Sequence, residues 1–556
     1  MKKFKKALSL LLAGTMILSS TACTQNEEGG TNINTNANAN TNSGAENTAA
    51  PDQSFSEAEV KPIDETAPTG NIVVLTYDTS WESSKEELIT KFEKETGGTF
   101  TYRLSGSGDE YFQALGTFIA SGDSPDIVTY EWRSFPHAMS YNVYTPLDSY
   151  IDIDGDLWKD MKPIAEQFVY NGKHYYFPNE ITTNYCLNYN NRVLQANNMP
   201  DPMELLENNE WTWSAFEKML DQWCLMDDNH IGFNGASGCG MSFCGTTGEK
   251  FIDIQGSEII NNARSASISR CMSWLEGMRK NGLLGVSDAQ AGATGHSNGY
   301  EPPDQAFVDG NLLFLAMEPF WAYNSAKEKF WNLGQEEEIK FVPFPRDDNS
   351  DTYYHTINTS GFMVPAGASN VKGAVDWINF AHREITDPAN VAKAKDTAIA
   401  DIPAYKTKCQ NADCGDTSEN ADNKGRHVYT DEENENNVTV CPVCGTQREQ
   451  KFKLVWSEEQ YDLYKELCNP SGRFELLYDH CYGFSSDVSD LYAGDEESLQ
   501  DGVVFHDQSY TTLIETKYNV IEGYLQEYRD IMKKNASGET VTMDWSATAA
   551  PETEAQ

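Results

Sequence analysis

The sequence has no apolar run of the ~20 residues that a membrane-spanning helix needs. Its longest apolar stretch, from Ala7 to Leu18, is short for that purpose. Basic residues are also scarce: 41 Lys and Arg stand against 85 Asp and Glu, which gives a formal net charge of −44. This charge argues against nucleic acid or an anionic lipid surface as a partner. We attribute most of it to solubility.

The sequence carries few marks of an enzyme. It contains no His-Glu-x-x-His zinc motif and no phosphate-binding loop. The stretch Gly295-His-Ser-Asn-Gly299 matches a nucleophile-elbow pattern, but Pro302-Pro303 forbids the helix that must follow. The run Asp152 to Asp156 resembles a calcium loop without its closing Glu. We therefore expect no catalysis; a glycosidase, which needs only two carboxylates that no motif marks, is the class left open.

The N-terminus has the layout of a secretory signal. Lysines fill most of positions 2–6, the apolar stretch follows, and the small residues Ser20-Thr21-Ala22 lead directly into Cys23. This order resembles a bacterial lipoprotein signal, in which the cysteine is lipid-modified, although Ser20 stands where Leu is usual. We expect residues 1–22 to be removed and Cys23 to anchor the protein at the extracellular face of the cell membrane. Ordinary secretion without a lipid is the alternative.

Two polar segments flank the body of the chain. Residues 23–68 are rich in Asn, Thr, Ala, Glu and Ser and contain one aromatic residue, Phe55. Such a segment buries too little apolar surface to offset its ordering entropy. We expect it to be a disordered, lipid-anchored linker, and we expect residues 541–556 to be a disordered tail.

The body, residues 69–540, is long enough for two lobes. Its start alternates strand and helix: strands are predicted at 71–76, 99–104 and 127–130. A loop is predicted at 77–84, then a helix that ends at Gly97-Gly98, and later a helix that Asp109 can cap. This alternation predicts an α/β fold with a parallel sheet. Ligands bind beyond the carboxyl ends of such strands, where Tyr77, Asp78, Trp81, Ser105, Glu131 and Trp132 are found.

Several motifs in order along the body point to one family. They are Gly122-Asp-Ser-Pro-Asp-Ile-Val128, Asn171-Gly-Lys-His-Tyr-Tyr-Phe-Pro178, Tyr189-Asn190 with Val193-Leu194, Thr212-Trp213-Ser-Ala-Phe216, and Phe307-Val-Asp-Gly310 through Ala316-Met317. Together they resemble the extracellular solute-binding proteins of family 1, the sugar-binding proteins of ABC importers, although the last motif has a longer stretch between Gly310 and Ala316.

The resemblance implies a type II periplasmic-binding fold: two α/β lobes, a hinge, and a ligand cleft between the lobes. We place the first part of the N-lobe at 69–181, the first part of the C-lobe at 182–360, and the second part of the N-lobe at 361–404. Residues 453–540 would complete the lobes. The chain would cross the hinge near 179–185 and 359–364, where Gly361 would supply backbone freedom or mark a bulge. Closure around the solute would present it to the permease.

A sugar offers an apolar face and a rim of hydroxyls, so its site needs aromatic planes and carboxylates. The candidate ligand contacts are Asp78, Trp81, Glu131, Trp132, Tyr185, Glu318 and Trp321. For each of them the alternative is a packed core aromatic or a solvated carboxylate. A second function also stays open: a sensor or surface glycan-capture module of the same fold that presents its ligand to a membrane signalling partner.

An insertion at 405–452 carries two cysteine pairs, each followed by Gly. The pairs, Cys409 with Cys414 and Cys441 with Cys444, resemble the knuckles of a zinc ribbon, although the first has four intervening residues rather than two. We expect a structural zinc site, which has no open position for a substrate. Two disulfides are the alternative for a secreted protein. Elsewhere, local links between Cys239 and Cys244 and between Cys468 and Cys481 are conceivable.

Overall fold

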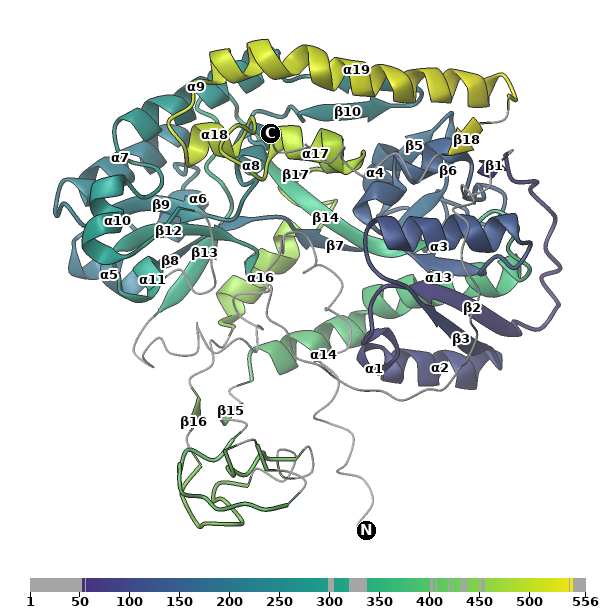
Figure 1. Ribbon diagram of the computed structural model, residues 1–556, viewed down its shortest axis with the longest axis horizontal. Helices are drawn as coiled ribbons and strands as arrows, with labels where there is room; N and C mark the ends of the chain where they lie inside the picture. Colours follow the sequence, from purple (N-terminus) through teal and green to yellow (C-terminus); the bar gives the residue numbers. More distant parts are fainter. Residues whose placement is uncertain are drawn as a thin grey trace, which may run out of the picture.

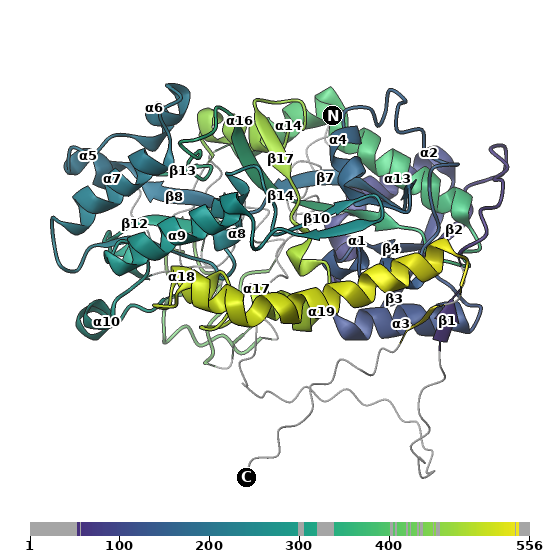
Figure 2. The same cartoon turned by 90° about the horizontal axis from the view of Figure 1, so that it is seen from above.

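The computed structural model describes residues 53–55, 57–298, 305–319, 338–400, 404–405, 408–418, 421–422, 424–430, 433, 438–448, 450–451, 456–539 and 541–543. Within these ranges the chain forms two lobes, each built on a sheet with helices around it (Figures 1 and 2). No helix in them combines the length and apolar character needed to cross a bilayer.

The N-lobe sheet has the strand order β17-β14-β4-β2-β3, and β7 pairs with β14. Its strands are β2 (Asn71–Thr76), β3 (Thr99–Leu104), β4 (Ile127–Thr129), β7 (Tyr176–Thr183), β14 (Tyr353–Met363) and β17 (Phe474–Leu477). Strand β2 pairs with β3 and β4 in parallel, as the strand–helix alternation predicted. The helices around this sheet are α1 (Trp81–Ser84), α2 (Glu86–Thr96), α3 (Asp109–Ala120) and α13 (Val371–Thr386).

Local signals place α2 where the sequence predicts it, because Ile89 and Phe92 face the core and Gly97 ends the helix with a φ of 72°. Two local predictions were wrong. The expected loop 77–84 contains the short helix α1, whose Trp81 is drawn into the core. The N-cap of α3 is Gly108, and Asp109 instead accepts a hydrogen bond from Arg133 Nη1 at 2.8 Å.

Trp377 of α13 is the centre of the N-lobe core and is fully buried. Its ring centroid lies 5.0 Å from that of Phe100 and 5.2 Å from that of Phe92. The rings of Trp81 and Phe362 both lie 5.9 Å away, mostly at steep angles. Edge-to-face aromatic contacts of this kind add specific geometry to a large buried apolar area.

The C-lobe sheet has the order β13-β8-β12-β9, and all of its strands are largely buried. Its strands are β8 (Cys186–Asn190), β9 (Ile231–Gly235), β12 (Leu312–Met317) and β13 (Ile339–Val342). The helices of this lobe are α5 (Asn191–Ala196), α6 (Pro202–Glu207), α7 (Trp213–Cys224), α8 (Gly240–Gly245), α9 (Ala266–Lys280), α10 (Asp288–Thr294) and α11 (Gln305–Val308).

Strands β7 and β14 connect the lobes. They pair antiparallel from Ile357 opposite Thr183 to Met363 opposite Tyr176, and β7 leads into β8 of the C-lobe. The register shifts at Ser360 and Gly361, so this glycine marks a bulge. An added Cβ at Gly361 would meet Tyr176 and Asn179 at 3.0–3.1 Å, which favours Gly at this close approach.

The C-terminal part returns across both lobes. Its elements are α16 (Glu458–Leu467), η5 (His480–Tyr482), α17 (Ser486–Tyr492), α18 (Asp501–Val504), α19 (Tyr510–Ala536) and β18 (Val541–Met543). Short elements elsewhere include η1 (Trp132–Ser134), η2 (Ala138–Tyr141), α4 (Lys162–Ala165), η3 (Glu166–Phe168), β5 (Val169–Tyr170), β6 (Lys173–His174), β10 (Ile252–Gln255), β11 (Glu258–Asn261), α14 (Pro388–Ala398), β15 (Ala404–Tyr405) and β16 (Gln450–Lys451).

The expected linker and tail are partly ordered. Residues of β1 (Gln53–Phe55) pair antiparallel with β18, and Phe55 is only 8% exposed. The carbonyl of Phe55 also accepts a hydrogen bond from Asn142. Composition alone missed this order because the partners lie almost five hundred residues apart in the chain. Cys23 and the rest of the linker before residue 53 lie outside the described residues.

Replacing Trp377 with Ala should destabilise the N-lobe by about 3–5 kcal/mol, because the substitution empties the centre of the aromatic core. Urea unfolding followed by circular dichroism measures this change. Leu104→Ala is the matched control: that side chain is 59% exposed, and its loss should change the free energy of unfolding by less than ~0.5 kcal/mol. Equal effects of the two variants would contradict the assigned core.

Candidate functional site

Asp78 follows β2 at the edge of the N-lobe that faces the C-lobe. Its Oδ1 accepts hydrogen bonds from the amide and hydroxyl of Ser80 at 2.8 and 2.7 Å. Its Oδ2 is buried and has no hydrogen-bond partner among the described residues. An acceptor held in this way is suited to a hydroxyl donor from a solute. The sequence prediction of Asp78 as a candidate contact is compatible with this geometry.

Lys85 lies close to Asp78 and was missed by sequence reasoning. It is only 8% exposed, and burial lowers the pKa of its ammonium group. The nearby charges of Glu180 on β7 and of Asp78 oppose that shift. The residue gave no signal in the sequence, because a Lys at the start of a charged helix is ordinarily solvated. The Lys85 ammonium group adds a hydrogen-bond donor beside the carboxylates of Asp78 and Glu180.

Glu131 follows β4 and caps η1. Its carboxylate accepts hydrogen bonds from the Arg133 amide at 2.7 Å and from Arg133 Nε at 3.3 Å. Burial raises the pKa of Glu131, and the Arg133 charge opposes the shift. Trp132 is half-buried, with the Arg133 guanidinium 5.0 Å from its ring centre and Tyr482 6.4 Å away at a right angle. Glu131 therefore positions the segment, while Trp132 presents an aromatic plane.

Trp81 lies beside Asp78 and Lys85 in the chain fold, with the Lys85 ammonium 5.9 Å from its ring centre, but its side chain is turned into the core. Only 1% of it is exposed, and its ring packs against Phe100, Tyr102, Phe362 and Trp377. The structure gives Trp81 the environment of a core residue, which was the alternative considered for every aromatic candidate. The short helix α1, which no sequence signal marked, turns this side chain inward.

The C-lobe contributes Tyr185 and Glu318. The Tyr185 hydroxyl donates a hydrogen bond to the carbonyl of Ser237 at 3.3 Å, just beyond the end of β9. Glu318 follows β12 and accepts a hydrogen bond from the Thr183 hydroxyl at 3.1 Å. Strands β9 and β12 are parallel, so Ser237 and Glu318 lie at the same edge of the sheet. Trp321, the remaining candidate, lies outside the described residues.

A hollow of about 160 Å³ lies next to the end of β9. It is lined by Ser237, Asn298, Gly494, Asp495, Asp501, Phe505 and His506. Asp501 is 4% exposed, and its carboxylate accepts hydrogen bonds from the amides of Gly238 and Gly494 at 2.8 and 3.0 Å. The Ser237 hydroxyl donates a further hydrogen bond to it. Burial raises the pKa of Asp501. The tendency of ligands to bind beyond the carboxyl ends of strands could have identified Ser237 from the sequence. Asp501 could not be identified in this way, because it belongs to a distant segment of the chain.

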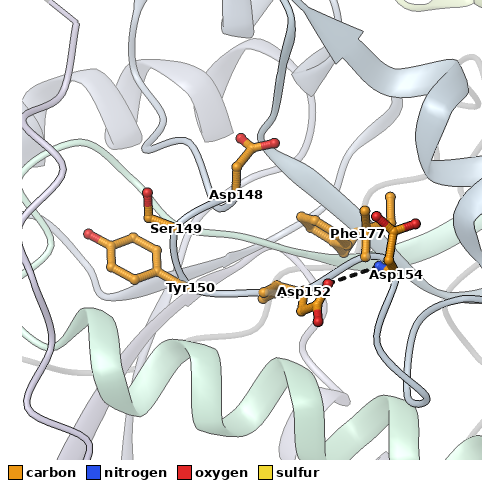
Figure 3. Close-up of a pocket in the computed structure, with 8 residues that line it drawn as sticks. Asp148, Ser149, Tyr150, Asp152, Asp154 and Phe177 are labelled. Atoms are coloured by element: carbon orange, nitrogen blue, oxygen red, sulfur yellow. Dashed lines mark hydrogen bonds between the residues drawn. The ribbon is translucent and has the colours of Figure 1, made fainter.

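A second hollow, of about 440 Å³, lies on the N-lobe around the acidic run 148–154 (Figure 3). Its carboxylates are already engaged. Asp148 bonds the His174 ring at 2.7 Å, and Asp154 bonds Lys162 at 2.6 Å. Asp152 accepts from the Asp154 amide at 3.1 Å. The carboxylates of this run are therefore satisfied by partners within the N-lobe.

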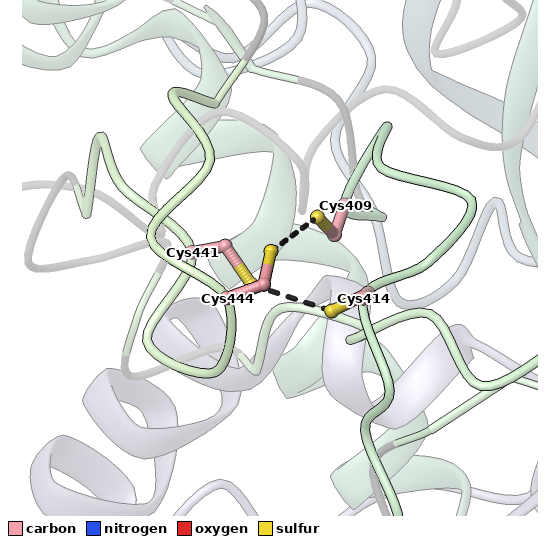
Figure 4. A group of neighbouring side chains, drawn as sticks. All are labelled: Cys409, Cys414, Cys441 and Cys444. Atoms are coloured by element: carbon pink, nitrogen blue, oxygen red, sulfur yellow. Dashed lines mark hydrogen bonds between the residues drawn. The ribbon is translucent and has the colours of Figure 1, made fainter.

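The four cysteines of the insertion converge (Figure 4). Their sulfur atoms all lie within 4.8 Å of one another, with Cys409 and Cys444 3.5 Å apart and Cys414 and Cys441 3.7 Å apart. A tetrahedral site with Zn–S bonds of 2.3 Å has sulfur–sulfur edges of ~3.8 Å. A disulfide requires ~2.05 Å. The cluster can therefore hold a metal ion, and its spacing matches four thiolate ligands.

The surroundings of the cluster shift the thiol pKa values of its cysteines in different directions. The hydroxyl and amide of Thr446 lower the pKa of Cys444 to about 6, whereas burial raises the pKa of Cys409 to about 12. His427 stays outside the sulfur cluster, because its ring bonds Asp416 at 2.7 Å and Glu433 at 3.1 Å.

The other cysteine links left open by the sequence are not formed. Every described cysteine is a free thiol, including Cys239, Cys244, Cys468 and Cys481. Cys239 directly precedes the short helix α8, Cys244 lies near its end, and both are buried. The suggested local links were therefore wrong in this structure: burial within the cores, rather than pairing, accounts for these residues.

The nucleophile-elbow pattern does not have its required setting. Gly295 is the C-cap of α10 with a φ of 75°, so a helix precedes the serine where the motif needs a strand. His296 to Asn298 form no helix or strand, and Gly299 lies outside the described residues.

Comparison with known proteins gives one family. A sequence model described as "bacterial extracellular solute-binding protein" matches residues 87–413. No curated protein sequence matches the chain. Among solved structures, a binding protein from Bacillus subtilis in an open conformation is 13% identical and aligns over 82% of this chain and 98% of its own, with a TM-score of 0.50. This likeness supports the two-lobed α/β fold.

Two further structures align over similar lengths. An ABC substrate-binding protein from Listeria monocytogenes in complex with cycloalternan is 15% identical and covers 82% of this chain and 99% of its own, with a TM-score of 0.49. A sugar transporter from Rhizobium etli is 16% identical and covers 83% of this chain and 99% of its own, with a TM-score of 0.48.

Proposed function

The chain belongs to the bacterial extracellular solute-binding proteins, and from this premise we propose that it captures a small polar solute, a mono- or oligosaccharide, between its lobes. Lobe closure around the solute would then present it to the permease of an ABC importer. The proposal gives the protein a binding role and no catalytic one. It also places the protein at the extracellular face of the cell membrane, anchored through lipidated Cys23.

One observation carries this proposal: polar and aromatic groups from both lobes follow the strands that end toward the boundary between them. The N-lobe supplies Asp78, with an unpartnered buried oxygen, and the half-buried ring of Trp132. The C-lobe supplies Tyr185, Glu318 and Ser237. Aromatic planes suit the apolar face of a sugar, and carboxylates accept its hydroxyls. Trp321 belongs to the proposed set from its sequence position after β12.

A saturating sugar should raise the thermal unfolding midpoint of the protein. At one hundred times its Kd a ligand adds about 2.7 kcal/mol to the folded state, which moves the midpoint by about 2–4 °C for a chain of this size. The measurement is differential scanning fluorimetry of the chain from residue 53 onward against mono- and oligosaccharides and other small polar solutes.

Trp132→Ala should abolish the shift, because it removes the aromatic plane. Trp274→Ala is the control, since Trp274 is stacked on Trp213 within the C-lobe; it should lower the midpoint yet keep the ligand-dependent rise. No rise with any solute in folded protein would contradict solute capture. It would favour the second candidate, a sensor or surface interaction module of the same fold.

We also propose that the insertion binds one structural zinc ion through Cys409, Cys414, Cys441 and Cys444. The sulfur spacing supports four thiolate ligands, and the described residues of the insertion form only a small core, made of these cysteines, Tyr429 and Val438. In a unit with so little apolar surface, metal binding would supply most of the folding free energy.

Purified protein should contain about one zinc per chain, because four thiolates close a tetrahedral site. Elemental analysis measures the zinc, and the charge-transfer absorption of the cobalt form reports thiolate ligation. Cys414→Ser should lose most of the metal, whereas Cys224→Ser, which lies outside the cluster, should retain it. Disulfides at these four positions in metal-free protein would contradict the proposal.

A further inference from the structure

Helix α19 runs along both lobes on one side of the molecule (Figures 1 and 2). It spans 27 residues, from Tyr510 to Ala536. At 1.5 Å per residue, a helix of this size is about 40 Å long. A straight helix is stiff along its axis, since lengthening it would break its internal hydrogen bonds. Its two ends are therefore held at a nearly constant separation.

The first end of α19 is attached to the C-lobe. The Tyr510 hydroxyl donates a hydrogen bond to the carbonyl of Ala263, just before α9. The Tyr510 amide donates to Glu276 of α9 at 3.0 Å. About two turns further on, the Arg264 guanidinium lies 4.0 Å from the ring centre of Tyr518. These contacts join the helix to the segment that packs on the C-lobe sheet.

The other end of α19 is attached to the N-lobe. Tyr528 is buried, and its hydroxyl is hydrogen-bonded to Nδ1 of His137. Two turns later, the Asn535 side chain accepts a hydrogen bond from Asn142 at 2.9 Å and donates one to the Tyr170 hydroxyl at 2.9 Å. It also donates to the carbonyl of Ser140. Burial lowers the pKa of His137 to about 3, so this contact joins two neutral groups at pH 7.

The helix lies on the β17 side of the crossing strands. In the N-lobe sheet, β14 and its partner β7 separate β17 from β4, β2 and β3. Beyond β17, η5 contacts β10 and α17, and α19 packs on β11 and α17. Asp479, next to η5, accepts the amides of Phe251 and Ile252 at 2.6 and 3.1 Å. The space between the lobes is therefore filled on this side by η5, α17, α19 and the β10–β11 hairpin.

We propose that α19 is a strap that opposes lobe closure. If the lobes rotate about the crossing strands β7 and β14, closure on the β2 side moves the attachment points of α19 apart. Because the helix cannot lengthen, its attachment at Asn535 and Tyr528 must be released before the lobes close fully. The strap thus biases the solute-free protein toward the arrangement seen here. This inference rests on the proposed lobe closure, and it adds the element that shifts the equilibrium between open and closed lobes.

Single-molecule fluorescence energy transfer in solute-free protein tests the strap. Leu104 of the N-lobe and Leu225 of the C-lobe are 59% and 87% exposed, so dyes can be attached there through noncanonical residues while all cysteines are kept. Asn535→Ala removes three hydrogen bonds from the strap. At about 1 kcal/mol net for each bond, losing the equivalent of even one of them should raise the ratio of closed to open molecules about fivefold. Tyr528→Phe, which keeps the ring contact with Phe484, should shift it in the same direction.

Gln526→Ala is the control, because this exposed side chain bonds only to Asp530 on the same helix, at 2.8 Å. Its closed population should equal that of the unchanged protein. A closed population that neither Asn535→Ala nor Tyr528→Phe raises above this control overturns the strap. The outcome is separate from solute capture: a protein that binds no sugar still reports its lobe equilibrium, and a protein that binds sugar with no response to either variant closes without working against α19.

Discussion

The antiparallel pairing of β7 with β14 is the interaction on which the relation between the lobes depends. One strand, β14, bonds to β4 and to β17, so it holds the N-lobe sheet together. Its partner β7 passes almost directly into β8, the second strand of the C-lobe sheet. The backbone hydrogen bonds between β7 and β14 therefore complete the N-lobe sheet, and β7 then continues into the C-lobe. The bulge at Ser360 and Gly361 interrupts this ladder between the lobes.

This connection decides where a solute can lie. The strands β2 and β4 end toward the C-lobe with Asp78 and Trp132, while β9 and β12 end toward the N-lobe with Ser237 and Glu318. On the β17 side, η5, the β10–β11 hairpin and α19 fill the space between lobes. In the proposed closure, the two faces approach each other on the other side. Solute capture, the direction of closure and the resistance of α19 thus follow from one geometry.

Local patterns predicted the parts of the fold that local forces decide. Strands 71–76 and 99–104 have the predicted bounds, because the alternation of strand and helix in this part of the chain is marked by clear turn residues such as Gly97. The cysteine spacing likewise predicted the cluster in the insertion. Long-range packing decided the rest: Trp81 turns into the core beside Trp377, and Phe55 becomes ordered through β18. Asp501 reaches the hollow from beyond the insertion, at a distance along the chain that no spacing rule covers.

The most direct test of solute capture between the lobes is hydrogen–deuterium exchange of the whole chain with and without a defined mixture of oligosaccharides. A solute held by both lobes should slow exchange together at residues 77–85 and 131–135 of the N-lobe and at 236–242 of the C-lobe, because closure shields both edges at once. Protection confined to one lobe, or exchange unchanged at both edges under conditions of demonstrated binding, would contradict the account.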